Sequence, residues 1–225
     1  MVSAKRGAVA APRRAAPRGA GGASELDRAL AEALPRVAPR ASPAAAEGIR
    51  AFLHLLSEWA PRVDLTAARD PRELVDLFVA DAALLAEAAR DASGERWVDV
   101  GTGAGAPGIV LALLAPALRV TLVEPRAKRA AFLRTVIGRL GLDRVSLVPA
   151  RSEVVSPRSF DVAVSRATLP PPEWLREGAR LAPAVWVLLA RGDAPALAGW
   201  RVAVEHEYVW PLTGVARRAL RYVPE

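Results

Sequence analysis

A strand-like run that leads through a glycine-rich turn into an apolar run constrains the fold of this chain more than any other feature. Arg96–Val100 is rich in β-forming residues, a turn with four glycines over 101–108 follows it, and Ile109–Leu114 is apolar with a helical pattern. Glycines permit a positive φ and let a ligand approach the backbone without meeting a Cβ atom. A glycine loop between a strand and a helix is typical of α/β folds that bind a nucleotide-like ligand there.

The residues around this loop favour an adenosyl ligand that carries positive charge. Three of the glycines spell G-x-G-x-x-G, a pattern that also fits a dinucleotide. Asp99 stands two residues before Gly101, where its carboxylate would repel a pyrophosphate but attract the ammonium and sulfonium of S-adenosylmethionine. Glu124, which ends the second predicted strand, is placed to accept hydrogen bonds from ribose hydroxyls and fits NAD equally well. S-adenosylmethionine is the predicted cofactor; another nucleotide and a purely structural turn are the alternatives.

From residue 96 onward, short β-rich runs alternate with helical ones. Strands are predicted over 96–100, 119–124, 144–148, 160–165, 185–190, 201–209 and 216–223, with helices over 109–114, 128–140 and 172–181. This alternation indicates βαβ units and a parallel sheet with helices on both faces, whereas the last two strands suit an antiparallel hairpin at the sheet edge. We therefore predict an α/β, Rossmann-like methyltransferase fold with a seven-stranded, mostly parallel sheet.

Three helical patterns precede this sheet and begin at Ser24, Ser42-Pro43 and Asp70-Pro71, which are typical N-cap signals. The chain of 225 residues is accordingly divided into a disordered basic tail (1–23), an N-terminal helical extension (24–92) and a methyltransferase core (93–225). The tail is basic and nearly free of large apolar side chains, which argues against folding.

Composition excludes several kinds of chemistry. The chain has no Cys and two His, so disulfides, a thiol nucleophile, a Cys-type zinc site and an iron–sulfur cluster are ruled out, and we expect no metal. The net charge of +7 is weak evidence for nucleic acid, because the tail carries much of it. The chain has no run of roughly 18 apolar residues that would span a membrane and no secretory signal pattern, so we expect a cytoplasmic monomer; a transit peptide is the alternative reading of the tail.

Several motifs occur together in a fixed order. They are Asp64-Leu65-Thr66, Arg69-Asp70-Pro71, the loop Asp99–Gly108, Lys128-Arg129, Phe132-Leu133-Arg134, Arg151-Ser152-Glu153 and Ser165-Arg166-Ala167. Over roughly residues 43–222 the chain thereby resembles the RsmG (GidB) 16S rRNA guanine-N7 methyltransferases. The resemblance implies an enzyme that transfers a methyl group from S-adenosylmethionine to N7 of a guanosine, with 16S rRNA or the small ribosomal subunit as partner.

The loop and the resemblance together assign the site residues. The predicted cofactor contacts are Asp99, Gly101, Gly103, Gly105, Ala106, Glu124, Ser152, Glu153 and Arg166. Arg166 is also the predicted catalytic residue, and the predicted substrate contacts are Asp64, Arg151, Arg191 and Arg217. Either Arg217 or Arg218 corresponds to the family's C-terminal arginine.

The chain departs from the family pattern on the predicted substrate side. Asp64 replaces an Asn, and Arg191 stands where a Lys is expected. The chain keeps Asp81 of the family's His-x-x-Asp-Ser run, whereas Phe78 and Ala82 replace its His and Ser. These departures keep two alternatives open: a methyltransferase of the same fold that acts on a small molecule or protein, and a non-catalytic module that binds cofactor or RNA. Without Cys, C5 methylation of pyrimidines through a thiol adduct and radical methylation through a cluster are excluded. Guanine N7 already carries a free lone pair, so direct displacement there needs no general base.

Overall fold

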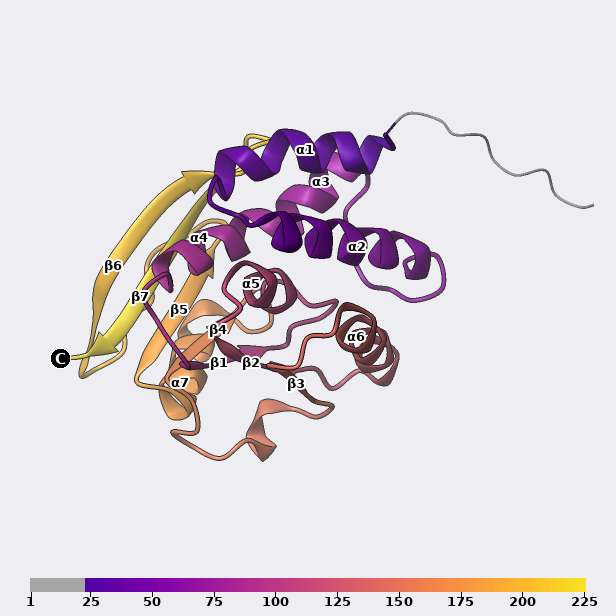
Figure 1. The fold of residues 1–225 in the computed structure, drawn as a ribbon. Coiled ribbons are helices and arrows are strands. Elements are labelled where there is room, and N and C mark those ends of the chain that lie inside the picture. Colours follow the sequence, from indigo (N-terminus) through magenta and orange to yellow (C-terminus); the bar gives the residue numbers. More distant parts are fainter. Residues whose placement is uncertain (1–22) are drawn as a thin grey trace, which may run out of the picture.

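A twisted seven-stranded sheet runs through the molecule, with helices on both faces (Figure 1). The computed structural model describes residues 23–225, so the predicted tail lies outside the described residues except for Ala23. The strands are β1 (Arg96–Val100), β2 (Arg119–Val123), β3 (Val145–Val148), β4 (Val162–Ser165), β5 (Ala184–Leu189), β6 (Trp200–Val209) and β7 (Ala216–Pro224). Each lies within two residues of its predicted range.

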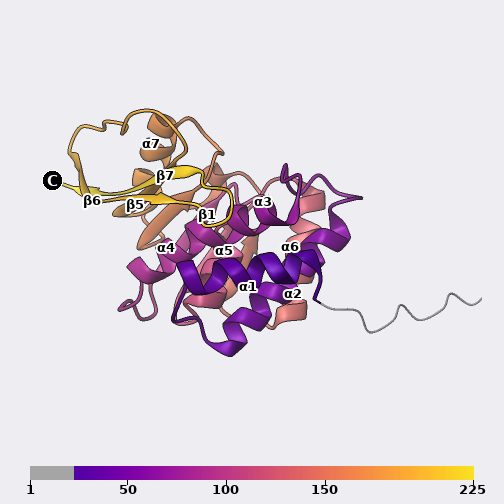
Figure 2. The same cartoon turned by 90° about the horizontal axis from the view of Figure 1, so that it is seen from above.

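The strand order is β3-β2-β1-β4-β5-β7-β6. Strands β1 to β5 pair in parallel, whereas β7 runs antiparallel to both β5 and β6. The predicted α/β fold with a mostly parallel sheet is therefore confirmed, and so is the antiparallel hairpin at its edge. The hairpin and α6 (Ala127–Leu140) lie at opposite ends of the molecule (Figure 2).

Each face of the sheet packs against its own set of helices. One hydrophobic cluster combines Trp97 of β1 with α5 (Gly108–Leu114), α6 and the N-terminal helices. The other combines Val98 and Val100 with Leu175 of α7 (Pro171–Leu181). This division follows from the alternation of side chains along a strand, which sends neighbouring residues of β1 to opposite faces.

The N-terminal helices begin where the sequence predicts. They are α1 (Glu25–Val37), α2 (Pro43–Trp59), α3 (Pro71–Val75), the π-helical segment η1 (Asp76–Ala80) and α4 (Asp81–Ala88). Ser24, Ser42 and Asp70 each accept a hydrogen bond from the backbone N–H three residues on, which confirms all three predicted N-caps. The third predicted helix is interrupted by η1, a wider turn that local residue patterns do not reveal.

The helices of the extension share a core with the helices that cover the sheet. Phe52 of α2 is fully buried, and its ring centroid lies 5.6 Å from that of Phe78 in η1 and 6.4 Å from that of Phe132 in α6. At Gly48 an added Cβ would lie 2.6 Å from Leu113 Cδ2, so the missing side chain allows α2 to approach α5 closely. These contacts join residues 24–92 and 93–225 through one core. The division of the chain into an extension and a methyltransferase core stays a prediction. In the described part of the chain, no helix is long and apolar enough to cross a membrane.

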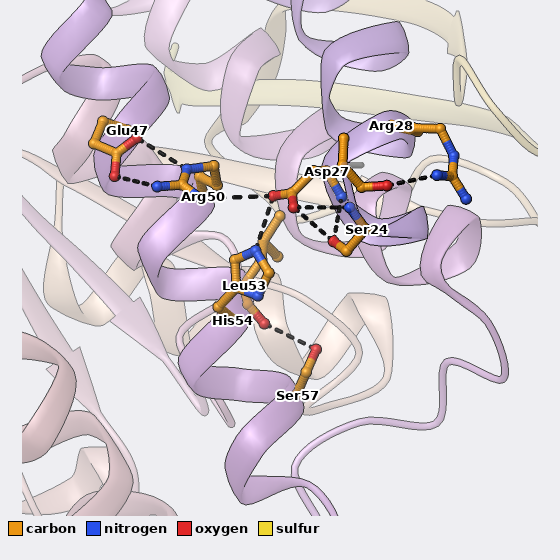
Figure 3. A network of polar contacts seen from close by, with 9 residues as sticks. Ser24, Asp27, Arg28, Glu47, Arg50, Leu53, His54 and Ser57 are labelled. Atoms are coloured by element: carbon orange, nitrogen blue, oxygen red, sulfur yellow. Dashed lines mark hydrogen bonds and ion pairs between the residues drawn. The ribbon is translucent and has the colours of Figure 1, made fainter. Parts of the chain in front are cut away.

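A polar network joins α1 to α2 through the carboxylate of Asp27 (Figure 3). Ser24 Oγ donates to Asp27 Oδ2 over 2.7 Å, and His54 Nε2 of α2 lies 2.8 Å from Asp27 Oδ1. Arg50 Nη1 lies 3.9 Å from the same Oδ1 atom. The hydrogen bonds from Ser24 and then His54 lower the pKa of Asp27 to about 2. Because the folded state holds this carboxylate ionised, the network stabilises the fold at pH values above the ordinary pKa of Asp and loses this contribution as the pH falls toward 2.

Replacing Asp27 with Ala is expected to lower the free energy of unfolding at pH 7 by about 1–2 kcal/mol, because the variant loses the capping box and the contact to α2. Urea unfolding followed by circular dichroism measures the change. Glu25→Ala is the matched control, since Glu25 is an exposed acid in the same first turn. Equal losses for the two variants would contradict a specific role for Asp27.

Candidate functional site

A cleft of about 920 Å³ opens at the carboxyl ends of the parallel strands. Its walls come from the loops after β1, β2, β4 and β5, from the 64–67 loop, from η1 and α4, and from the β6–β7 hairpin. Strand β1 lies between β2 and β4, so the strand order reverses at this point. Ligands of doubly wound sheets bind in the crevice that such a reversal creates, and this volume suits a drug-sized ligand.

The glycine loop forms one wall of the cleft. Gly101 and Gly103 line it and have φ values of +66° and +62°. At Gly101 an added Cβ would lie 2.2 Å from Thr168 Oγ1, because the loop after β4 crosses over this residue. At Gly103 the nearest atom to an added Cβ is Arg129 Nη1, 3.7 Å away. Gly101 is therefore required by the packing of the protein, whereas the surface at Gly103 is open to a ligand.

The carboxylate of Glu124 holds the glycine loop against the end of β2. Oε2 accepts from the Gly103 N–H over 2.9 Å, and Oε1 accepts from the Arg126 N–H over 2.8 Å. Glu124 is 3% exposed and lines the cleft beside the loop. A carboxylate oxygen can accept more than one hydrogen bond. Oε1 and Oε2 of Glu124 therefore both retain capacity for the ribose hydroxyls that the sequence predicts as their partners.

Asp99 lies beneath the loop rather than in the cleft wall. Its Oδ2 accepts from Thr102 Oγ1 over 2.6 Å and from the Gly108 N–H over 2.9 Å, which joins the two ends of the loop. Oδ1 is buried and has no hydrogen-bond partner among the described residues. Burial raises the pKa of Asp99 to about 7, against the opposing effect of the hydrogen bonds from Thr102 and Gly108. The observed contacts of Asp99 are those of a residue that shapes the loop.

The raised pKa of Asp99 predicts a pH-dependent stability. The folded state favours protonated Asp99 and the unfolded chain loses this proton near pH 4, so the contribution of this group falls as the pH rises from about 4 to about 7. Asp99→Asn removes the titration. We expect the unfolding free energy of the native protein to decrease relative to that of the variant by roughly 1 kcal/mol for each pH unit over this range, and to level off above it. Urea unfolding of both proteins at pH 5, 6, 7 and 8 measures the difference, and a difference that is independent of pH would refute the shift.

Two arginines lie in another part of the cleft lining. Arg166, directly after β4, donates from Nη1 to the Leu77 carbonyl oxygen in η1 and lies 3.6 Å from Asp81 Oδ2. Burial lowers the pKa of the Arg166 guanidinium; Asp81 opposes this effect and the nearby Arg217 adds to it. Part of the guanidinium of the predicted catalytic residue is thus engaged by η1 and α4, which the sequence does not indicate.

Arg217 of β7, not Arg218, faces the cleft. Its Cζ lies 3.9 Å from the ring centroid of Trp210, and both residues line the cavity. Arg218 instead pairs with Glu205 over 2.6 Å on the neighbouring strand. The two candidates for the C-terminal arginine are separated by the alternation of the strand.

The other predicted residues divide into two groups. Asp64, Ala106 and Arg191 line the cleft, and Asp64 Oδ2 lies 3.0 Å from Arg129 Nη2 at its rim. The following predicted residues are not among those that line it: Gly105, Arg151, Ser152 and Glu153. Gly105 packs the loop on α5, because an added Cβ would lie 2.5 Å from Ile109 Cγ1. The roles predicted for residues 151–153, in and before the short helix η2 (Ser152–Val154), stay predictions.

The sequence alone did not place Asp81, Thr168, Tyr208 and Trp210 in the site, although all four line the cleft. Asp81 carried two signals, since it is an acid within the apolar run 77–86 and is the Asp that the chain keeps from the family's His-x-x-Asp-Ser run. The two aromatic residues carried none, because only the folded hairpin places them opposite Asp81.

A glycine loop after β1, a carboxylate at the end of β2 and a sheet ending in an antiparallel hairpin define the class of Rossmann-like methyltransferases. The chain belongs to the GidB family: the family's model, described as rRNA small subunit methyltransferase G, matches residues 45–188. The predicted family is confirmed.

Two relatives named ribosomal RNA small subunit methyltransferase G illustrate the similarity. The protein from Chromohalobacter salexigens is 46% identical over 99 residues, which are 44% of this chain and 46% of the relative. The protein from Nocardioides sp. is 46% identical over 104 residues, which are 45% of this chain and 40% of the relative. The matches thus span less than half the length of these relatives.

Solved structures share the fold. A mutant of MtNAS crystallised in complex with S-adenosylmethionine has a TM-score of 0.53 and 24% identity, covering 79% of this chain and 75% of that one. A putative RNA methyltransferase from Pyrococcus horikoshii has a TM-score of 0.50 and 16% identity, covering 78% of this chain and 98% of that one. At these identities the similarity supports the fold alone.

Proposed function

We propose that this protein is an S-adenosylmethionine-dependent methyltransferase that methylates N7 of a guanosine in 16S rRNA. The observation that carries the proposal is one cleft that is lined by the glycine loop, by Glu124 and by two arginines, Arg166 and Arg217, in a chain of the GidB family. The proposed setting is the cytoplasm, where a monomer would meet the small ribosomal subunit.

The glycine loop and Glu124 fit the cofactor. Glu124 has acceptor capacity for two ribose hydroxyls, and Gly103 leaves open space where any side chain would stand. Gly101 and Ala106 would supply backbone around the ligand, and the engaged Asp99 would keep the loop in shape. When bound, the cofactor would supply a methyl group on its sulfonium: guanine N7 would attack this carbon in line, the S–CH3 bond would break, and S-adenosylhomocysteine would leave as a neutral thioether.

Arg166, Arg217 and the residues around them, which we call the substrate wall, fit an electron-rich, anionic substrate. Arg217 and, farther along the lining, Arg191 place positive charge at the cleft. Arginine donates to guanine O6, which leaves N7 free for the methyl group, or binds a phosphate through two parallel hydrogen bonds. Guanine N7 carries its own lone pair, so no residue needs to remove a proton. The contribution of the protein is alignment of the two reactants, which can lower a barrier by several kcal/mol.

The exposed basic residues next to the cleft suit a large polyanion. Arg126 and Lys128 lie at the start of α6, Arg134 lies in its middle, and all three are exposed. Contacts of this kind bind nucleic acid through phosphate charge and weaken as salt concentration rises.

A methyl-transfer assay tests the proposal. Purified protein and S-adenosylmethionine labelled in its methyl group are incubated with small ribosomal subunits from a bacterial strain that lacks this modification. We expect label in 16S rRNA, and strand cleavage after borohydride and aniline treatment at one guanosine. Subunits from the parent strain, whose 16S rRNA already carries the modification, serve as the control and should accept no label. Label on free metabolites with none on subunits would favour the small-molecule alternative, and cofactor binding without any transfer would favour a binding module.

A further inference from the structure

A buried carboxylate joins three residues of the substrate wall. Asp81 is 2% exposed and is the first residue of α4, immediately after η1. Its Oδ1 accepts from Tyr208 Oη over 2.8 Å and from Trp210 Nε1 over 2.9 Å, while Oδ2 lies 3.6 Å from Arg166 Nη1. All three partners line the cleft: Arg166 directly follows β4, whereas Tyr208 and Trp210 lie at the end of β6.

The hydrogen bond to Asp81 fixes the plane of the Trp210 indole, and this plane carries Arg217. The Arg217 Cζ atom stacks 3.9 Å from the ring centroid. Its Nε atom is buried without a hydrogen-bond partner among the described residues. Stacking on the ring is therefore the main contact that orients this guanidinium, and the orientation of the ring is set by Asp81.

Asp81 lies close enough to compensate the positive charge of one of the two arginines of the cleft, Arg166. Arg166 and Arg217 are close enough for the charge of Arg217 to lower the pKa of Arg166. Asp81 lies within ion-pair distance of Arg166, whereas no acid of the described part of the chain lies within that distance of Arg217. Of the two guanidinium groups, Arg217 is therefore the one whose charge remains available to an acceptor on a ligand.

A second buried acid provides a comparison. Asp76, the first residue of η1, accepts from the Thr213 N–H and Thr213 Oγ1, each over 2.7 Å, and from the Leu212 N–H. It clamps the same hairpin to the same helical segment, yet neither Asp76 nor these partners line the cleft. Asp76 therefore shares the structural task of Asp81 without its contacts to the substrate wall.

We propose that Asp81 is a positioning residue for the RNA substrate: it orients Trp210, and through Trp210 it orients Arg217 toward the phosphate or guanine edge of the target. The inference rests on the proposed function of the cleft.

The first experiment compares Asp81→Ala with Asp76→Ala in the full chain, because alanine removes the acceptor oxygens that asparagine would keep. For Asp81→Ala we expect the KM for unmodified small subunits to rise at least about 10-fold. The Kd for S-adenosylmethionine should change less than about threefold, because Arg166, the partner of Asp81 that is also a predicted cofactor contact, keeps its hydrogen bond to the Leu77 carbonyl oxygen. Asp76→Ala should lower the unfolding temperature similarly while it leaves the KM within about twofold. If both variants raise the KM alike, or if Asp81→Ala leaves the KM unchanged, the positioning role is overturned.

A second readout does not depend on methylation. The Arg217 Nε–H resonance, assigned by its loss in Arg217→Lys, reports the orientation and protection of this side chain. We expect Asp81→Ala to shift it and to speed its exchange with water at least about 10-fold, while Asp76→Ala leaves it near its native position. An unchanged Arg217 resonance in Asp81→Ala overturns the inference even if the subunits are methylated. A changed resonance with no methylation of any RNA supports Asp81 as positioning Arg217 and contradicts the proposed function instead.

Discussion

Replacing Gly103 with Val is expected to weaken the binding of S-adenosylmethionine by more than about 100-fold while the chain remains folded. Gly103 lines the cleft with a φ of +62°, and an added Cβ would meet no atom closer than 3.7 Å. The valine side chain would therefore stand in the open space of the cleft rather than in the protein interior. A β-branched residue at positive φ also costs about 1–2 kcal/mol of backbone strain, which the loop must absorb.

Isothermal titration calorimetry measures the affinity, and thermal unfolding shows whether the variant is folded. Gly94→Val is the matched control, because Gly94 has a φ of +75°, no atom within 4 Å of an added Cβ, and a position away from the cleft lining. It imposes the same kind of strain without obstructing the cleft, so its affinity should stay native. An unchanged affinity in Gly103→Val would show that the loop is only a structural turn.

Phe52→Ala is expected to lower the free energy of unfolding by about 3–5 kcal/mol, the range for truncating a fully buried aromatic residue. Phe52 has no exposed surface and packs on Phe78 of η1 and Phe132 of α6. It therefore joins the helical extension to a helix that covers the sheet, and its loss leaves a cavity between them.

Urea unfolding followed by circular dichroism and by tryptophan fluorescence measures this loss. The two signals should report one transition before and after the substitution, since the extension and the sheet share their core. Val154→Ala, at a side chain that is 67% exposed, should change the stability by less than about 0.5 kcal/mol. Two separate transitions, or a loss near that of Val154→Ala, would show that residues 24–92 unfold as an independent unit.

The geometry also explains why the substitutions on the substrate side are compatible with the cleft. Phe78, which stands in the place of the family's His, packs against Phe52, and the guanidinium of Arg166 lies 5.9 Å from the Phe78 ring centroid. Asp64 pairs with Arg129 at the rim, which brings the 64–67 loop to the first turn of α6. Both departures from the family pattern thus have partners within the same cleft.

The sequence by itself determined the strands, the glycine loop and the helix starts, because each depends on residues near one another in the chain. The repeat of apolar residues distinguishes a strand from a helix, and a serine or aspartate before a helix caps it whatever lies elsewhere. Its position at the end of the second predicted strand made Glu124 a candidate, the family resemblance added Arg166, and both line the cleft.

Only the tertiary structure decided what those candidates contact. Asp81 and Tyr208 are 127 residues apart in sequence. They meet because β7 and β6 extend the sheet and bring the end of β6 to the start of α4. The same packing separated Arg217 from Arg218 and placed Asp99 under the loop instead of in the cleft wall. Such contacts depend on how elements pack across the whole chain, and packing between distant segments leaves no periodic pattern in the sequence of either one.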